Sequence, residues 1–328
     1  MVQVRGESGL KAAPPITNDR ICVLMNARAG KDDKQDVARQ MEAAFARHPG
    51  RFELRMMEKG AGVADSCARA MKDGFGIIVA AGGDGTISGI AGQLAGSGRR
   101  MGIVPQGTFN FVARGLGIPE DIDAAVDLIA TGTARPFPVG EVNGEIFLNN
   151  ASLGIYPQIL KEREGTYKRW GRSQLAAHWS VLMTFLSFRS PVRMKVRVGG
   201  KEIRARTPLA FVARSAYQLE HYGLDGADCI RNGEFALFLL PDVSRWQLLL
   251  SALKLANKGM QSKRDFELIR GSDIEIETTK GSQLVAMDGE RVRMTAPFRF
   301  RMHEDALHVI APDEVAATDA AAPDAAVA

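Results

Sequence analysis

The sequence predicts an α/β protein with two domains, an N-terminal domain on a parallel sheet and a C-terminal β-sandwich. Residues 20–104 alternate short apolar runs with stretches that are apolar at helical spacing, as in parallel sheets covered by helices. After residue 136, short segments with period-two alternation dominate, which indicates antiparallel strands. The chain of 328 residues is long enough for two cores of ordinary domain size.

In the first domain we expect strands at residues 20–25, 52–57, 77–81 and 101–104. Helices are indicated by one apolar face formed by Val37, Met41, Ala44 and Phe45, and by residues 63–71. Ligands of parallel sheets bind at the carboxyl ends of the strands. The residues that follow these strands are therefore the candidates for a functional site.

In the second domain the expected strands are residues 145–152, 192–198, 209–213, 235–240, 273–278, 283–287 and 298–302. Two helical patterns interrupt them. Residues 175–188 carry a broad apolar face after a basic stretch at residues 161–172, and residues 246–257 predict a core helix. We expect domains at residues 19–135 and 136–304, a flexible N-terminus at residues 1–18 and a disordered tail at residues 313–328.

Composition excludes several classes of protein. Cys22, Cys67 and Cys229 have no metal-binding or disulfide spacing and indicate buried thiols in a reducing compartment. Residues 1–18 lack the apolar core of a signal peptide, and no stretch approaches the roughly 20 apolar residues of a membrane span. The net charge of +4 comes without a basic-aromatic motif, so we expect no nucleic-acid partner and a cytoplasmic protein. An anionic membrane surface and plain solvation both fit this charge.

The segment Gly82-Gly83-Asp84-Gly85-Thr86 follows the apolar run at residues 77–81 and precedes a helical pattern. This order is typical of phosphate binding, because glycines let backbone N–H groups approach an anion and the helix presents free N–H groups. Asp84 would repel a phosphate unless it holds Mg²⁺, orders water or accepts a proton, so the segment indicates phosphoryl transfer. Alone, the same residues also fit an ordinary turn in which Asp84 caps the helix.

A second turn of this kind follows the next strand. Residues 102–110 read as a short apolar run that ends in Gly107-Thr108-Phe109-Asn110. Because the two turns follow neighbouring strands, we expect them to face one crevice.

At these residues the chain resembles the diacylglycerol kinase catalytic-domain family, which includes sphingosine and ceramide kinases and many bacterial lipid kinases. The matching pieces occur in family order over roughly residues 20–312. They are Asn26 with Gly30-Lys31, the segment at residues 82–86, residues 105–110 with Ala113-Arg114 and residues 116–119, and Asp288-Gly289-Glu290.

The resemblance implies a nucleotide-binding first domain, a lipid-binding sandwich, and a return of the chain to the first domain at residues 305–312. It implies ATP and Mg²⁺ as cofactors and a membrane lipid as substrate, with peripheral contact at the inner membrane surface. The apolar pattern at residues 175–188 then fits either a core helix or an interfacial helix. A homodimer is one assembly that we consider.

The resemblance also assigns roles to residues. Glu290 matches the general base of the family, although Asp-Gly between strands is by itself a strong turn signal. Asp84 would act in catalysis and hold or orient Mg²⁺. The residues expected to bind the nucleotide are Asn26, Gly30, Lys31, Gly82, Gly83, Asp84, Gly85, Thr86, Gly107, Thr108 and Asn110.

The chain departs from the family pattern at four places. Many bacterial members have a carboxylate where Phe111 stands, a proline where Ala27 follows Asn26, and a threonine where Met56 stands. A structural Mg²⁺ of bacterial members is bound at an Asp-Gly that corresponds here to Asn232-Gly233, and an amide is a poorer Mg²⁺ ligand than a carboxylate.

The sequence therefore predicts an ATP-dependent lipid kinase that phosphorylates a hydroxyl of diacylglycerol, ceramide, a sphingoid base or a related lipid. NAD and sugar kinases share the Gly-Gly-Asp-Gly turn and are an alternative. A catalytically silent lipid-binding or regulatory protein is another alternative, which the absence of a carboxylate at Phe111 favours and the presence of Asp84 and Glu290 opposes.

Overall fold

The computed structural model describes residues 20–26, 34–57, 62–157, 191–256, 258, 260 and 264–313. The predicted ligands Gly30 and Lys31, the N-terminus at residues 1–18 and the helical pattern at residues 175–188 lie outside this part of the chain.

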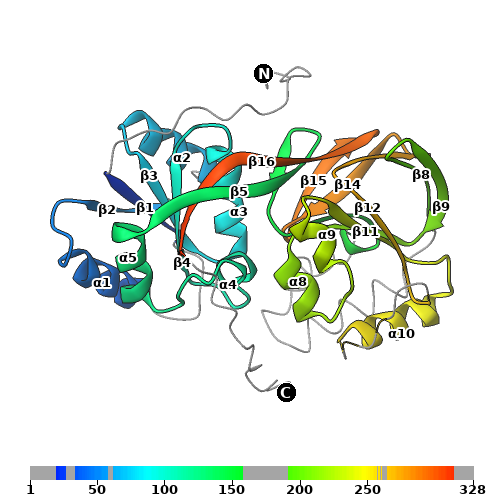
Figure 1. Ribbon diagram of the computed structural model, residues 1–328, viewed down its shortest axis with the longest axis horizontal. Coiled ribbons are helices and arrows are strands. Elements are labelled where there is room, and N and C mark those ends of the chain that lie inside the picture. The colour runs from blue at the N-terminus through cyan, green and yellow to red at the C-terminus, as the bar shows by residue number, and fades with distance from the viewer. Residues whose placement is uncertain are drawn as a thin grey trace, which may run out of the picture.

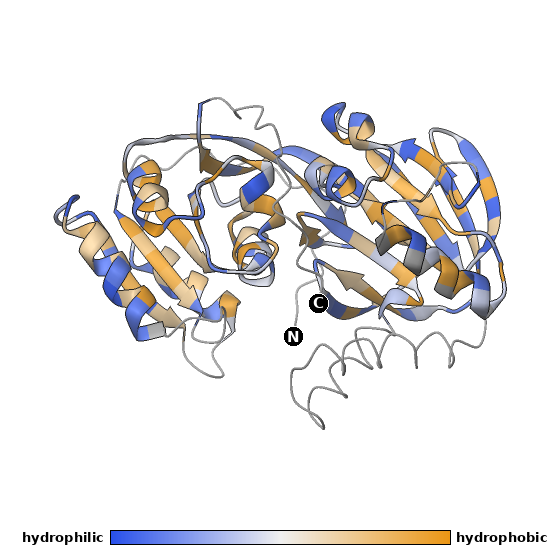
Figure 2. Ribbon diagram, turned by 90° about the horizontal axis from the view of Figure 1, so that it is seen from below, coloured by the Kyte–Doolittle hydropathy of each residue, from blue (hydrophilic) through white to orange (hydrophobic). Residues whose placement is uncertain are grey.

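The first domain contains a parallel sheet in the order β2-β1-β3-β4 (Figure 1). These strands are β1 (Ile21–Asn26), β2 (Phe52–Met57), β3 (Ile77–Gly82) and β4 (Arg100–Pro105). The strands β1, β3 and β4 are almost wholly buried. Figure 2 shows the hydrophobic colour of the strands of this sheet. All four predicted strands of this domain are confirmed.

Helices cover both faces of this sheet. They are α1 (Lys34–Phe45), α2 (Val63–Lys72), α3 (Asp84–Leu94), α4 (Phe111–Gly115) and α5 (Ile122–Thr131). On one face α2 and α3 pack on side chains such as Leu24 and Ile78, and on the other α1 and α5 pack on Val23 and Val79. Alternate residues of one strand thus serve two cores.

Two long antiparallel strands connect the domains, β5 (Thr133–Val142) and β16 (Phe298–Ala311). One end of β16 pairs in parallel with β4, and its other end pairs with β13 (Asp273–Thr278) in the sandwich. The boundaries that we expected at residues 135/136 and 304/305 fall inside these two strands. Of the returning segment expected at residues 305–312, residues 305–311 are the second half of β16.

The second domain is a sandwich of two mainly antiparallel sheets. One sheet continues from β16 through β13 to β8 (Val192–Val198) and β9 (Lys201–Thr207), with β6 (Glu145–Phe147) beside β5. The other has the order β12-β11-β10-β7-β14-β15. Its strands are β12 (Glu267–Gly271), β11 (Phe235–Leu239), β10 (Leu209–Ala213), β7 (Asn150–Gly154), β14 (Ser282–Met287) and β15 (Glu290–Thr295).

The core of the sandwich lies between these sheets. The ring of Phe147 lies 5.8 Å from that of Phe235 and 6.3 Å from that of Phe300, measured between centroids. The predicted fold class, an α/β chain with a parallel-sheet domain and a β-sandwich, is therefore confirmed.

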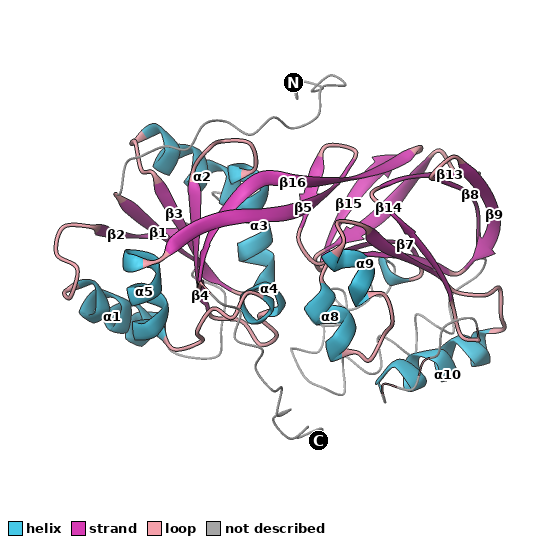
Figure 3. Ribbon diagram, viewed as in Figure 1, coloured by secondary structure: helices cyan, strands magenta, loops and turns pink. Residues whose placement is uncertain are grey.

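In the described part of the sandwich domain the helices are α8 (Ala216–His221), α9 (Ala227–Arg231) and α10 (Arg245–Ala256) (Figure 3). The expectation that the helix at residues 246–257 is a plain core helix is wrong in part. Leu248 is buried, but Trp246 is 68% exposed and Leu250 is 56% exposed. Two large apolar side chains of the described part of this helix are thus exposed to solvent.

The three cysteines are buried and unpaired, as predicted. Burial raises the pKa of Cys22 and of Cys67 to about 12, so neither thiol ionises readily. Among the described residues, no helix has both the length and the apolar character needed to cross a membrane.

Candidate functional site

The turn between β3 and α3 is closely packed around its glycines. A Cβ atom at Gly82 would lie 2.7 Å from both Cβ and Oγ1 of Thr86, so a larger residue does not fit there. The backbone N–H groups of Thr86 and Ile87 both donate to the carbonyl of Gly83, which places Gly83 at the N-cap of α3. The first N–H groups of a helix have no acceptor inside it, so this end can bind an anion.

The two predicted turns touch each other. A Cβ atom at Gly107 would lie 2.7 Å from Cα of Gly83, and the N–H of Gln106 donates to the carbonyl of Gly82 at 2.9 Å. The two turns that follow neighbouring strands are thus in direct backbone contact. This contact requires glycine on both sides.

The side chain of Asn110 holds the second turn in shape. Its Oδ1 accepts from the N–H of Gly107 at 2.9 Å, and its Nδ2 donates to the carbonyl of Gly107 at 3.1 Å and to Glu120 at 3.1 Å. Asn110 is buried and adopts a left-handed conformation with φ of 49°. Thr108, in contrast, is exposed.

Asn26 connects the end of β1 to the first turn. Its Nδ2 donates to Oγ1 of Thr86 at 2.9 Å. The carboxyl ends of β1, β3 and β4 therefore lie together, and Asn26, Thr86 and Gly107 are brought close to one another there.

Asp84 lies in the first turn of α3 and is partly exposed. Its Oδ1 accepts from the backbone N–H of Val112 at 3.4 Å. Burial raises the pKa of Asp84 above its ordinary value, and the charge of Asp288 adds to the rise, although nearby backbone N–H groups oppose it. A carboxylate with a raised pKa gains from a bound cation.

Asp288 and Gly289 form the two-residue turn between β14 and β15, with φ of 46° and 87°. Positive φ at both positions is the geometry of a type I′ hairpin turn. The interpretation of Asp288-Gly289-Glu290 as a hairpin turn is thus correct for its backbone.

The hairpin brings Glu290 to the start of α3. A Cβ atom at Gly85 would lie 3.8 Å from Oε1 of Glu290, so the carboxylate stands beside the first turn of that helix. Glu290 is exposed, and within the described residues its carboxylate has no hydrogen-bond or ion-pair partner. Residues separated by about 200 positions in the sequence therefore share one site.

Asp288 and Arg214 support the segment next to Glu290 and were not among the predicted site residues. The Asp288 carboxylate accepts three backbone N–H groups, from Leu148 at 2.7 Å, Asn149 at 2.8 Å and Asn150 at 3.0 Å. Burial raises the pKa of Asp288, against the effect of these donors. The Asp-Gly turn signal was visible in the sequence, but the partners of its carboxylate were not.

Arg214 holds the same segment from the other side. Its Nη1 donates to the carbonyl of Leu148 at 3.3 Å, and its guanidinium lies 4.1 Å above the ring of Phe137. Burial lowers the pKa of Arg214 to about 10, and the charge of Asp288 acts in the opposite direction. The sequence signal that could have identified it is an arginine directly after the buried strand β10.

The chain is similar to known diacylglycerol kinases over much of its length. The model of the diacylglycerol kinase catalytic domain matches residues 20–142. A diacylglycerol kinase of Bacillus subtilis strain 168 is 30% identical over 251 residues, which are 74% of this chain and 80% of that protein. The chain belongs to the diacylglycerol kinase catalytic domain family. This membership confirms the predicted enzyme class, a lipid kinase.

Further relatives share parts of the chain or its fold. A diacylglycerol kinase of Staphylococcus aureus strain JH9 is 35% identical over 102 residues, which are 30% of this chain and 32% of that protein. The solved structure of a diacylglycerol kinase from Bacillus anthracis strain Sterne covers 91% of this chain and 98% of its own, with a TM-score of 0.64 and 17% identity. A second structure from that strain, covering 91% of this chain and 99% of its own, has a TM-score of 0.69 and 19% identity. These structures support the two-domain fold.

One departure from the family pattern has a structural explanation. Phe111 stacks on Phe109 with ring centroids 5.4 Å apart and meets His221 of α8 at 5.6 Å. At the position where many bacterial members have a carboxylate, this lipid kinase thus has an aromatic contact between its two domains. Asp84 then supplies the carboxylate at the β3–α3 turn.

Few side chains near this turn could serve as ligands of a metal ion. Among the described residues no group of three or more His, Cys, Asp or Glu side chains could hold a metal ion, and this includes the surroundings of Asn232-Gly233. Mg²⁺ in kinases is often bound by one or two carboxylates together with substrate phosphates. Asp84, with its raised pKa, fits such a site.

Proposed function

We propose that this lipid kinase transfers the γ-phosphoryl group of ATP to a hydroxyl of diacylglycerol. The observation that carries the proposal is the position of Glu290 beside Gly85, which brings a carboxylate of the sandwich to the phosphate-binding turn of the other domain. The name of the relative from Bacillus subtilis supports diacylglycerol over ceramide or a sphingoid base as the substrate.

Glu290 acts as the general base. A lipid hydroxyl is a weak nucleophile, and an exposed carboxylate without a competing partner is available to accept its proton. The hairpin turn and the contacts of Asp288 hold the backbone of Glu290 in place.

Asp84 holds Mg²⁺ in the complex with the nucleotide. Mg²⁺ supplies positive charge that offsets the negative charge of the transferring phosphoryl group. Asp84 stays ionised when the cation is present, and the N–H of Val112 fixes the orientation of its carboxylate.

The glycine turns bind the phosphates of the nucleotide. Gly82, Gly83, Gly85 and Gly107 let backbone N–H groups approach the anion, and the N-terminus of α3 adds its dipole. Thr86, fixed by Asn26, and the exposed Thr108 complete this surface. Asn110 contributes by holding the turn, and we assign phosphate contacts to Gly30 and Lys31 on the basis of the sequence alone.

We also propose that the enzyme works at the cytoplasmic face of the membrane, as a peripheral protein. The acyl chains of its substrate remain in the bilayer, so only the hydroxyl has to reach Glu290. The weakly basic surface of the chain favours contact with anionic lipids.

The test is an assay of the purified protein with γ-labelled ATP and Mg²⁺. Diacylglycerol, ceramide and sphingosine are offered separately in mixed micelles, and NAD and glucose serve as non-lipid acceptors. We expect labelled phosphatidic acid and no other product. If labelled ceramide phosphate or sphingosine phosphate forms instead, the assignment of diacylglycerol as the substrate is wrong. Labelled NADP or sugar phosphate would overturn the proposal of a lipid kinase acting on diacylglycerol.

A further inference from the structure

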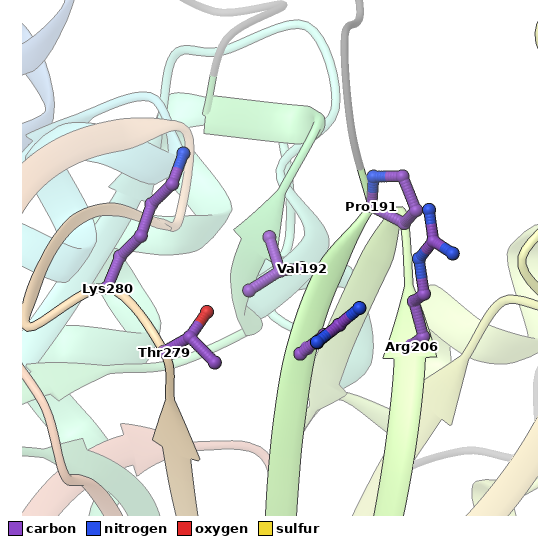
Figure 4. A pocket seen from close by; sticks show the side chains of 6 residues that line it. Pro191, Val192, Arg206, Thr279 and Lys280 are labelled. Carbon is purple, nitrogen blue, oxygen red and sulfur yellow. The ribbon is translucent and has the colours of Figure 1, made fainter.

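A basic pocket opens at the outer end of the sandwich, far in the sequence from the catalytic turns. It has a volume of about 380 Å³ and is lined by Pro191, Val192, Arg193, Arg206, Thr279 and Lys280. Figure 4 shows Arg206 and Lys280 on opposite sides of the pocket, with Val192 between them. The lining thus contains three cationic side chains and no carboxylate.

The charges of this pocket are less balanced than those of the neighbouring surface. Further along β8 and β9, carboxylates compensate the cations: Lys195 lies 3.2 Å from Glu277, and Arg197 lies 3.6 Å from Glu202. At the pocket, in contrast, Arg193 stands directly opposite Arg206 in the strand pairing. Like charges in such positions repel each other.

One carboxylate partly relieves this repulsion. Asp242 lies 3.1 Å from Nε of Arg206. Arg193 and Lys280 have no ion-pair partner in the described part of the chain. The pocket therefore has an excess of positive charge that an external anion can neutralise.

The ion pair with Asp242 also connects the pocket to helix α10, which begins three residues later. On α10 the exposed side chains of Trp246 and Leu250 are four residues apart and so lie on one face. Leu248, between them in the sequence, is buried. Two large apolar side chains are thus presented to solvent beside a basic pocket.

We propose that Trp246, Leu250, Arg193, Arg206 and Lys280 form a docking surface for an anionic lipid bilayer. Apolar side chains that enter the headgroup region and basic side chains that meet lipid phosphates are the two components of peripheral membrane binding. Tryptophan suits the boundary between water and hydrocarbon because its ring is apolar and its N–H is polar.

The bilayer is favoured over a protein partner by the combination of charge and shape. The pocket presents three cationic side chains to lipid phosphates, and α10 presents the exposed apolar side chains of Trp246 and Leu250. The inference rests on the proposed function only in that a lipid substrate requires contact with a membrane. Docking by this surface can be tested without any turnover.

The first experiment uses Trp246 as a probe. The chain has three tryptophans, and replacing the other two, Trp170→Phe and Trp179→Phe, leaves Trp246 as the only indole. We expect its emission to shift to the blue on vesicles of phosphatidylglycerol and phosphatidylcholine, and not on phosphatidylcholine alone. Sedimentation of the unchanged chain with the same vesicles provides a measurement that does not depend on these substitutions.

The second experiment removes the charges. Arg193→Gln and Lys280→Gln should each weaken binding to the anionic vesicles roughly 5-fold, since a basic residue near such a membrane contributes about 1 kcal/mol. The control is Arg39→Gln on α1, an exposed arginine of the other domain whose loss removes the same charge. Trp246→Ser should weaken binding on the order of 10-fold, and Trp246→Phe should weaken it less.

The outcomes separate this inference from the proposed function. The charge variants should phosphorylate a short-chain diacylglycerol in solution at the normal rate, so a protein that docks but lacks this activity would overturn the proposed function alone. Equal losses in Arg39→Gln and Arg193→Gln would mean a general effect of charge and would overturn the docking surface. An unshifted Trp246 emission on vesicles that bind the protein would also overturn it, as would a concentration-dependent dimer that buries Trp246.

Discussion

Oε1 of Glu290 lies 3.8 Å from the place that a Cβ atom at Gly85 would occupy. This is an ordinary van der Waals distance, so an alanine at this position would touch the carboxylate without displacing the backbone. At Gly85 the missing side chain therefore leaves room for the Glu290 carboxylate. At Gly82, in contrast, a larger residue would collide with Thr86 inside the fold.

The substitution Gly85→Ala should separate these two roles. We expect it to raise the free energy of unfolding by about 0.5–1 kcal/mol, because alanine favours a helix over glycine, and to lower kcat, because the methyl group restricts Glu290. Gly82→Ala is the matched comparison. Its Cβ would meet Thr86 at 2.7 Å, so it should lower the unfolding temperature. Denaturant unfolding and initial rates on both variants provide the measurement, and a destabilised Gly85→Ala would contradict the assignment.

Glu290→Gln should lower kcat by about 10²–10⁴ and leave ATP binding nearly unchanged, because the amide keeps the shape of the side chain and removes the base. Rates at saturating lipid and calorimetric ATP binding measure the two effects. A loss of ATP affinity that occurs only with Mg²⁺ would make Glu290 a metal ligand. Unchanged rate and affinity would leave Glu290 as part of a hairpin turn.

Much of the first domain could be predicted because its sheet is buried on both faces. Strands such as β3 consist of apolar residues alone and are bounded by glycines. The strand β16 was predicted as two pieces, because its surroundings change along its length. Residues such as Arg299 and Arg301 alternate with Phe298 and Phe300 in the sandwich, whereas Val309 and Ile310 are both buried beside the parallel sheet.

The candidate site was predictable only as far as local motifs describe it. Asp84 and Glu290 belong to short segments with recognisable turn signals. The predicted order of strands also places Asp84 at the carboxyl edge of the parallel sheet. The contact of Asp288 with residues 148–150 depends on the pairing of β7 with both β10 and β14. Such pairing between distant segments leaves no local pattern in the sequence. The exposure of Trp246 was missed for the same reason, since leucines at helical spacing do not indicate how many sides of a helix are covered.

Asp84→Asn should abolish activity and stabilise the protein at neutral pH in the absence of Mg²⁺. The pKa of Asp84 is raised in the folded state, so the folded protein binds this proton more tightly than the unfolded chain. Its contribution to stability is therefore lost as the pH rises from the ordinary value for aspartate through the raised value. An amide avoids this loss.

The same shift predicts how metal affects the enzyme. The acid limb of the pH–rate profile should move to lower pH as the Mg²⁺ concentration rises, because the cation competes with the proton for Asp84. Thermal unfolding with and without Mg²⁺ measures the effect on stability. Initial rates measured at intervals from about pH 5 to about pH 8 give the position of the acid limb. A profile that does not depend on Mg²⁺ would remove Asp84 from the metal site.

The last prediction concerns Asp288, which supports Glu290 without touching it in the described contacts. Asp288→Asn removes one of two equivalent acceptor oxygens and places an N–H₂ group against a backbone N–H of residues 148–150. The lost hydrogen bond and the unsatisfied donors should lower the free energy of unfolding by about 1–3 kcal/mol. The charge of Asp288 also raises the pKa of Asp84, so its removal should lower the pKa of Asp84 and move the acid limb of the activity profile downward. A variant that is merely less stable would keep the original profile at a temperature where it is fully folded. Arg214→Gln provides the opposite case: it destabilises the same segment but removes a positive charge, and therefore should not move the acid limb to lower pH.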